Sequence, residues 1–267
     1  MKFWLIICLG VFLTACQSNP NTGEQQSKEN GNKSHINVKH RKATEKNLSD
    51  VNAELGAGYI GNGNYEKALV KLQKAIKMDN SNATAYNYLG VLYWRLEKPN
   101  LAEKNFKLSI QKSPYDASIT HNYASFLCAE KKYKKALQMF AKVFKNPLYD
   151  RLLDAYQRAG NCSLKIPALK TARKYLAKAL KIDSKNPPAL LGMAKLFYKQ
   201  KNYKLAAYYF DRFTRHSKHS PDSLWLGINL ERKLGGKDKL SSYILTLKNL
   251  FPDSNETLML IQDKQEY

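Results

Sequence analysis

Residues 85–114, AYNYLGVLYWRLEKPNLAEKNFKLSIQKSP, set the pattern that the rest of the chain follows. Their apolar residues stand at the offsets that two amphipathic helices joined by a tight turn would produce. These residues are Leu89, Gly90, Tyr93, Ala102, Phe106 and Pro114. Small residues fall where the helices would cross closely, and large ones fill the gaps. The stretch therefore predicts a helix-turn-helix unit.

The same offsets recur along the chain, most clearly in the alanines of the second helices. They repeat at intervals of 34, 34, 36 and 34 residues: Ala68, Ala102, Ala136, Ala172 and Ala206. A period of about 34 is that of the tetratricopeptide repeat (TPR), in which each helix pair buries a face against the next. The pattern predicts an all-α superhelical solenoid at 47–253. Its six units are expected at 49–82, 83–116, 117–150, 153–186, 187–220 and 221–253.

The first 16 residues, MKFWLIICLGVFLTAC, are expected to hold a lipoprotein signal peptide at 1–15. The apolar run is too short for a stable membrane span and ends in small residues. The four residues that end at Cys16 resemble a bacterial lipobox, in which the cysteine is acylated and becomes the new amino terminus. The alternative is an ordinary signal peptide with an incidental cysteine. Gln17, where Asp would favour the inner membrane, points to the outer membrane.

The segments that flank the solenoid are predicted to be less ordered than its helices. Residues 16–46 are polar and contain few apolar side chains, so they cannot bury enough surface to offset the entropy of ordering. We expect them to form a lipidated N-terminus and a flexible tether. Residues 254–267 are expected to form a C-terminal tail with a short, frayed helix.

The chain is strongly basic, with 44 Lys and Arg against 22 Asp and Glu, a formal net charge of +22. Such a charge suits nucleic acid, an anionic membrane surface or an acidic protein face. Only eight of the 44 cations are Arg, the residue whose planar fork serves specific phosphate recognition. We therefore favour a lysine-rich solvated surface, and nucleic acid is not expected to be the main partner.

Two of the four cysteines, Cys128 and Cys162, fall in the predicted solenoid. They are expected on the first helices of neighbouring units, which stack about 10 Å apart. A disulfide needs Cα atoms about 4.4–6.8 Å apart, which two facing residues can satisfy, and an oxidising compartment favours it. The alternative is a pair of separate buried thiols.

No motif of a known catalytic site is found: neither HExxH, GxSxG, a Walker loop nor GxGxxG. No metal site is predicted, because His35 and His40 stand in the polar N-terminal segment without supporting Cys or carboxylate spacing. We expect no cofactor and no enzymatic activity. Solenoids of this kind bind other proteins on a concave surface built mainly from first helices.

The predicted protein-binding groove follows from the positions on first helices that face away from the core. It consists of Asn87, Val91, Trp94, Arg95, His121, Asn122, Ser125, Gln157 and Asn161. Amide side chains in such a groove can bond both donors and acceptors of a partner's backbone. Trp94 has two readings: an apolar anchor for a partner, or a packing residue between units.

Three segments are more specific than a TPR consensus requires: NYASFLC at 122–128, NPLY at 146–149 and AGNC at 159–162. Together with the lipobox and residues 85–116, they resemble the PilF/PilW family of type IV pilus biogenesis and stability lipoproteins. The resemblance covers almost the whole mature chain. It implies six repeats on the periplasmic face of the outer membrane, and it supports a Cys128–Cys162 disulfide.

The leading hypothesis is a non-enzymatic scaffold, anchored to the membrane by N-terminal acyl chains. The family resemblance implies that it promotes localisation or multimerisation of the outer-membrane secretin, or pilus stability. The expected partners are secretin subunits and other pilus assembly proteins. One alternative is an adaptor for outer-membrane protein assembly or murein hydrolases. Another, motivated by the charge of +22, is a DNA-binding accessory of DNA uptake.

Overall fold

The computed structural model describes residues 33–262, with side chains from residue 44 onward. The chain divides into two compact units, Met1–Lys42 and Ala43–Tyr267, and the packing described below belongs to the second. All regular elements of the described residues are helices, so the predicted all-α class is confirmed. The predicted signal peptide and Cys16 lie outside the described residues.

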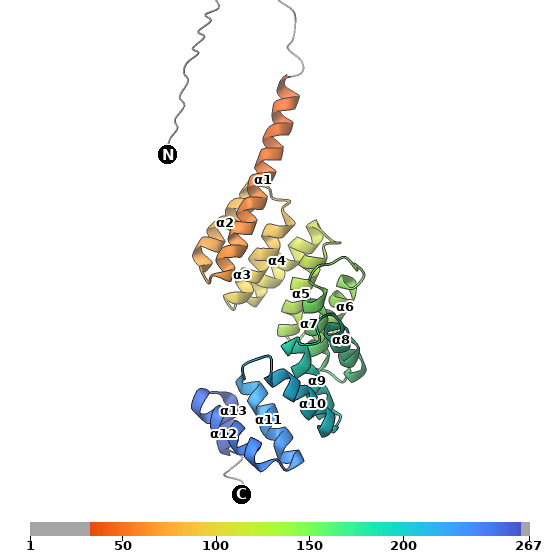
Figure 1. The fold of residues 1–267 in the computed structure, drawn as a ribbon. Helices are drawn as coiled ribbons and strands as arrows, with labels where there is room; N and C mark the ends of the chain where they lie inside the picture. The colour runs from red at the N-terminus through yellow and green to blue at the C-terminus, as the bar shows by residue number, and fades with distance from the viewer. Residues whose placement is uncertain (1–32, 263–267) are drawn as a thin grey trace, which may run out of the picture. The chain divides into compact units, whose positions relative to one another are not determined.

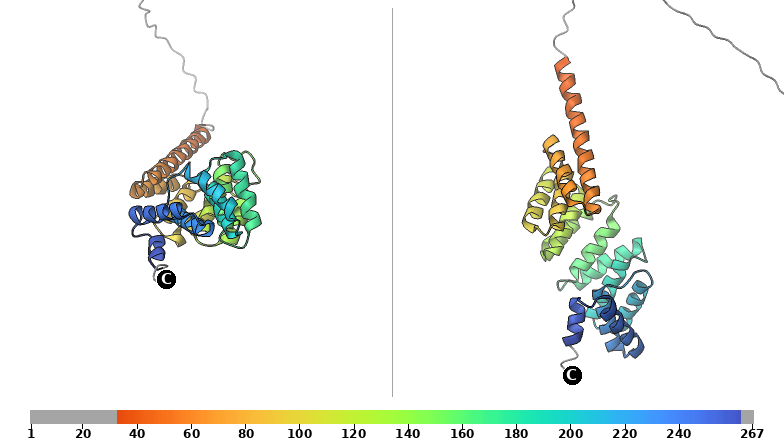
Figure 2. Two further views of the ribbon diagram at one scale, coloured as in Figure 1. Left: turned by 60° about the horizontal axis from the view of Figure 1, so that its bottom comes forward. Right: turned by 90° about the vertical axis from the view of Figure 1, so that its left-hand side faces the viewer.

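The helices of the described part form six pairs and one final helix, and Figure 1 shows them in chain order. Their bounds are α1 (Lys33–Gly61), α2 (Tyr65–Met78), α3 (Ala83–Arg95), α4 (Pro99–Lys112), α5 (Ala117–Ala129), α6 (Tyr133–Val143), α7 (Leu152–Ser163), α8 (Leu169–Ile182), α9 (Pro187–Lys199), α10 (Tyr203–Thr214), α11 (Pro221–Leu234), α12 (Lys237–Leu250) and α13 (Asn255–Gln262). From α3 onward, each pair packs on the next in a curved row (Figure 2).

The closest helix crossings occur at glycines, as the opening stretch predicts. A Cβ atom on Gly90 would lie 2.8 Å from the ring of Phe106, and one on Gly160 would lie 2.6 Å from the side chain of Leu176. Phe106 and Leu176 are fully buried. The missing side chain therefore lets the first helix approach the second closely enough for a large residue to fill the crossing.

Five of the six turns inside the pairs have a left-handed residue two positions before the second helix; the turn between α7 and α8 has none. It is glycine in two turns and another residue in three: Gly63 (φ 73°), Gly235 (φ 81°), Glu97 (φ 55°), Lys131 (φ 59°) and Lys201 (φ 58°). A residue with a Cβ costs about 1–2 kcal/mol in this region. The three non-glycine turns therefore hold local strain.

The N-terminal boundary of the first unit differs from the prediction. Helix α1 begins at Lys33, so the expected flexible tether is wrong for residues 33–46. The physical reason is that residues 33–55 contain neither Gly nor Pro, and nothing in them stops a helix.

The short helix expected in the C-terminal tail is present at residues 255–262, but the expectation that it is frayed is wrong. Helix α13 buries Thr257 and Leu260, which are 3% and 0% exposed. Leu260 belongs to a buried cluster with Leu224, Ile228 and Leu247. The last pair of the solenoid has no following pair, so α13 closes its open core.

Candidate binding groove

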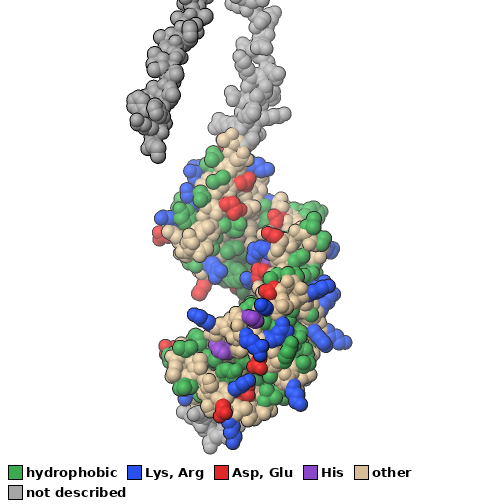
Figure 3. Space-filling view, viewed as in Figure 1, with side chains coloured by type: hydrophobic (Ala, Val, Ile, Leu, Met, Phe, Trp, Pro, Cys, Tyr) green, Lys and Arg blue, Asp and Glu red, His purple; other side chains and the backbone are tan. Residues whose placement is uncertain are grey.

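Three adjoining hollows run along the first helices of successive pairs. They have volumes of about 680, 610 and 490 Å³. The first two share Trp94 and Arg158, and the second and third share Asn161 and Lys165. Together they form one continuous depression, which we call the first-helix groove. Figure 3 shows this unit hollowed between α3 and α11.

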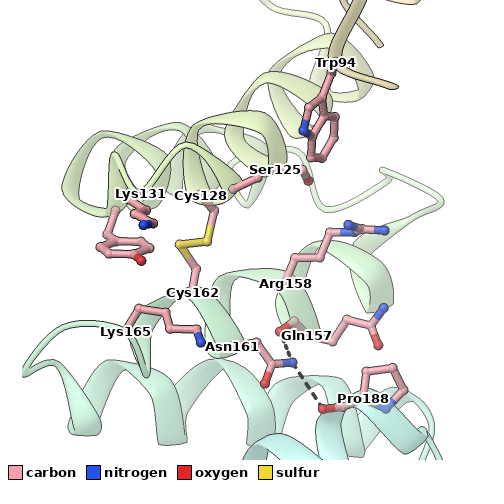
Figure 4. A pocket seen from close by; sticks show the side chains of 12 residues that line it. Trp94, Ser125, Cys128, Lys131, Gln157, Arg158, Asn161, Cys162, Lys165 and Pro188 are labelled. Atoms are coloured by element: carbon pink, nitrogen blue, oxygen red, sulfur yellow. Dashed lines mark hydrogen bonds between the residues drawn. A yellow bond between two sulfur atoms is a disulfide. The ribbon is translucent and has the colours of Figure 1, made fainter. Parts of the chain in front are cut away.

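Seven of the nine predicted groove residues line the first-helix groove: Val91, Trp94, Arg95, Asn122, Ser125, Gln157 and Asn161. The central hollow brings together side chains from α3, α5 and α7 (Figure 4). There the Asn161 amide donates hydrogen bonds to the carbonyls of Gln157 (3.0 Å) and Pro188 (3.2 Å). The second bond ties α7 to the start of α9.

Asn87 and His121 do not line the groove, and the expectation that they face it is wrong. They are 3% and 0% exposed. Asn87 accepts a 3.3 Å hydrogen bond from the amide of Asn122, so α5 covers it. The loop inserted after α6 folds back over His121 and places the Tyr149 hydroxyl 2.9 Å from its Nδ1 atom. The polarity of a side chain alone does not separate these buried contacts from groove positions.

The buried His121 lies beside a carboxylate beneath the groove. Burial lowers the pKa of His121 to about 4, although Asp154 opposes the shift. Its Nε2 atom is 3.6 Å from Asp154 Oδ2 and has no hydrogen-bond partner among the described residues. The ring is therefore neutral at physiological pH, and it serves packing rather than proton transfer.

Asp154 also holds two groove arginines that the sequence reasoning missed. The Nε of Arg158 donates to it at 2.8 Å, and Arg151 donates at 3.0 Å. Burial alone would raise the pKa of Asp154, but Arg158 and the Gln157 amide hold that pKa below its ordinary value. Arg151 and Arg158 flank Asp154 at i−3 and i+4, a spacing that places all three on one helix face. This spacing is the sequence signal from which the two arginines could have been predicted beside Asp154.

Gln157 holds an unsatisfied acceptor beneath the surface of the groove. Its amide nitrogen donates to Asp154 at 2.7 Å, which fixes the orientation of the side chain. Its buried Oε1 atom has no hydrogen-bond partner among the described residues. Buried acceptors are normally satisfied, so this atom is an exception within the described residues, and a ligand could reach it only if the side chain moved.

Trp94 packs between units and also stays accessible in the groove, so its use as an anchor for a partner stays a prediction. Its ring packs edge-on against Phe126, with the centroids 5.9 Å apart. Phe126 is fully buried, whereas Trp94 stays partly exposed and lines both of the larger hollows. One edge of the indole therefore belongs to the core, and the other offers apolar surface to a ligand.

A disulfide joins the two first helices at the centre of the groove. Cys128 of α5 and Cys162 of α7 are bonded, with their Cα atoms 5.9 Å apart (Figure 4). Of the two alternatives that the sequence left open, the structure has the disulfide. It links the third and fourth pairs where the inserted loop lengthens their connection, so it fixes the spacing of the groove walls.

The described residues offer neither a metal site nor a membrane span. Residues 44–262 contain no group of three or more His, Cys, Asp or Glu side chains placed to hold a metal ion. No helix in the described part of the chain is long and apolar enough to cross a membrane.

Known proteins share this architecture and sequence. A TPR repeat family model matches residues 58–97. The type IV pilus assembly protein PilF of Pseudomonas aeruginosa is 33% identical over 207 residues, which cover 78% of this chain and 82% of that protein. The chain belongs to the PilF family.

Solved structures of the PilF family show the same fold. The structure of Pseudomonas aeruginosa PilF has a TM-score of 0.74 and 31% identity, and the match covers 82% of this chain and 99% of that one. The structure of PilW, described as a widely conserved type IV pilus biogenesis factor, has a TM-score of 0.74 and 26% identity. That match covers 80% of this chain and 98% of PilW. The resemblance to the PilF/PilW family is thus confirmed.

Proposed function

We propose that this protein is a non-enzymatic type IV pilus assembly factor that binds outer-membrane secretin subunits in its first-helix groove. The observation that carries the proposal is the groove itself, in a chain of the PilF family. It presents the apolar edge of Trp94, the amide side chain of Asn161 and the half-exposed Arg158 along one continuous depression. These groups suit an extended or helical protein segment, because they offer apolar contact, a hydrogen-bond acceptor and positive charge together.

We further propose that the protein acts from the outer membrane, facing the periplasm, with acyl chains on Cys16. The lipobox at its N-terminus and membership of the PilF family support this location. Several acyl chains hold a protein far more firmly than one. The anchor would supply the location, and the groove would supply recognition while secretin subunits assemble.

The test is recovery of the secretin from solubilised envelopes, with variants that differ only in where they place a charge. Val91→Arg puts a long cation inside the groove, and Val70→Arg puts the same side chain on α2, where Val70 is 62% exposed. We expect Val91→Arg to abolish secretin recovery and detergent-resistant multimers, and Val70→Arg to retain both. In the same assay, Cys16→Ala should keep secretin binding but leave the secretin mislocalised.

Other outcomes of the pull-down would contradict the proposal. Recovery of the outer-membrane barrel-assembly machinery or of murein hydrolases, without the secretin, would favour the adaptor function. Normal secretin multimers in a deletion strain would also exclude the proposed role.

A further inference from the structure

A second surface of this unit, formed by the outer faces of α6 and α8, carries positive charge without acidic residues. The other second helices, α2, α4, α10 and α12, each contain an Asp or Glu, whereas α6 and α8 contain none. Eight exposed cations stand on these two helices: Lys134, Lys135, Lys142, Lys170, Arg173, Lys174, Lys178 and Lys181. We call this surface the α6–α8 basic face. Figure 3 shows Lys and Arg side chains along this edge of the unit.

The packing of α6 and α8 forces these cations onto one surface. Both helices turn a stripe of buried residues to the core, so that only their outer sides are left for charges. Phe144, which follows α6, lies against Tyr175 of α8 with the ring centroids 4.9 Å apart. This contact joins the carboxyl end of α6 to α8, and the two helices present a shared face.

Within the described residues, no acidic side chain compensates the charges of this face. None of the eight cations forms an ion pair with another residue of the described chain. Three of them lie 5.1–5.8 Å from the centroid of an aromatic ring: Lys135 over Tyr123, Arg173 over Phe197 and Lys178 over Tyr156. These contacts hold the side-chain stems against the unit while the charges stay in solvent. Closely spaced cations without partners repel one another, and an external polyanion relieves this repulsion.

Exposed aliphatic side chains at the ends of these helices favour an anionic bilayer over a nucleic acid as the binding partner of this face. Leu148, in the loop after α6, is 92% exposed, and Ile182, the last residue of α8, is 54% exposed. The loop is not loose, because the buried Tyr149 bonds to His121 and so directs its neighbour Leu148 outward. A nucleic acid would neutralise the lysines but would leave these aliphatic groups in water. An anionic bilayer offers headgroup charge to lysines and an acyl boundary to Leu148 and Ile182.

We propose that the α6–α8 basic face is a peripheral docking surface for anionic phospholipid, with Leu148 and Ile182 entering the headgroup region. The inference rests on the proposed lipid anchor, which would keep the unit beside a bilayer. The cations of this face are mostly lysine, which suits a membrane surface. Headgroups attract positive charge of any geometry, whereas recognition of a single phosphate favours the bidentate geometry of arginine. Docking would set which side of the unit faces the membrane and so leave the first-helix groove open to a partner.

Lysine reactivity on vesicles tests this proposal with the full chain. The protein is reconstituted through its N-terminal anchor, treated with an amine-acylating reagent and mapped by mass spectrometry. On vesicles of phosphatidylethanolamine and phosphatidylglycerol, Lys174 and Lys181 should react about fivefold more slowly than on phosphatidylcholine vesicles. Lys98 and Lys201, in turns inside the pairs, should react equally on both.

Matched variants separate docking from general charge. Lys174→Gln combined with Lys181→Gln and Leu148→Ser should remove the slowing at Lys178, whereas Lys98→Gln with Lys201→Gln should retain it. Both variants should still recover the secretin, so loss of docking is distinguishable from loss of the proposed function. If the anchor is absent, the protein will not float with vesicles, but excess anionic vesicles should still slow Lys174.

Two results would overturn the proposal. One is equal reactivity of Lys174 and Lys181 on anionic and neutral vesicles. The other is slowing by duplex DNA at low salt without any slowing by anionic vesicles, which would assign the face to nucleic acid instead.

Discussion

Side chains that the sequence assigns to the groove make polar contacts that join neighbouring first helices. Asn122 reaches Asn87 across α3 and α5, and Asn161 reaches the carbonyl of Pro188 across α7 and α9. A polar residue on the outer side of a first helix fits either a groove or such a contact. Only the position of the neighbouring helix decides whether such a residue lines the groove or forms a contact between helices. Sequence spacing does not give that position accurately enough to predict a single hydrogen bond.

His121 makes the stability of the protein depend on pH. Burial lowers its pKa to about 4 from an ordinary 6.5; the charge of Asp154 raises this pKa, and the charges of Arg151 and Arg158 lower it further. Below 6.5 the unfolded chain binds a proton that the folded chain does not, so the free energy of unfolding falls as pH drops towards 4. We expect a loss of roughly 2 kcal/mol between about pH 7 and about pH 5 from this group. Urea unfolding at the two pH values measures it.

The control for this prediction is another histidine of the same chain. His121→Leu should remove most of the loss on acidification, whereas His216→Leu, at an exposed loop position, should leave it in place. Asp154 does not confuse the comparison, because its pKa lies below its ordinary 3.8 and its contribution is lost only at lower pH. An unchanged pH dependence in His121→Leu would show that the ring is not held neutral by burial.

At the level of helices and turns, the left-handed non-glycine residues before α4, α6 and α10 offer a test of local energetics. Lys201 is exposed, adopts a φ of 58° and donates its backbone N–H to Tyr198 at 2.9 Å, a bond that glycine retains. Lys201→Gly should therefore raise the free energy of unfolding by up to about 1 kcal/mol. Lys74→Gly, at an exposed position inside α2, should lower it by about 1 kcal/mol. Thermal unfolding of the two variants should thus shift in opposite directions; a loss in both would mean that the turn is not strained.

The helices between α2 and α12 could be predicted closely, and the two ends could not. Turn residues such as Pro99 and Gly63 and a regular period mark where the inner helices begin and end. Helix α1 extends beyond the repeat, and this could not be predicted, because its polar N-terminal part has no hydrophobic period that would mark it as a helix. Helix α13 is too short for its pattern to distinguish a packed helix from a frayed one. Helix α13 covers apolar residues of the last pair, and their exposure is apparent only once the solenoid is folded.

For the whole molecule, a solenoid in which each pair contacts only its neighbours distributes stability along its length. Within the described residues, the tertiary contacts join successive pairs, and α13 contacts α11 and α12 alone. Damage at one end should therefore spread inward only as far as the coupling between neighbours reaches. The Cys128–Cys162 bridge lies in the middle of this row and couples the third pair to the fourth. We expect the two ends of the row to respond independently.

Leu260→Ala tests this expectation at the C-terminal end. Leu260 is fully buried with Leu224 and Leu247, so its truncation should lower the free energy of unfolding by about 2–5 kcal/mol. The loss should loosen the packing of helices α11, α12 and α13. Leu258→Ala makes the same chemical change on the same helix, where the side chain is 52% exposed, and should cost little. Amide hydrogen exchange would then show faster exchange in α11 and α12 of the Leu260 variant and unchanged exchange in α3 to α6. Equal acceleration throughout would mean that the six pairs unfold as one cooperative body, and α13 would then stabilise the groove as well as the end that it covers.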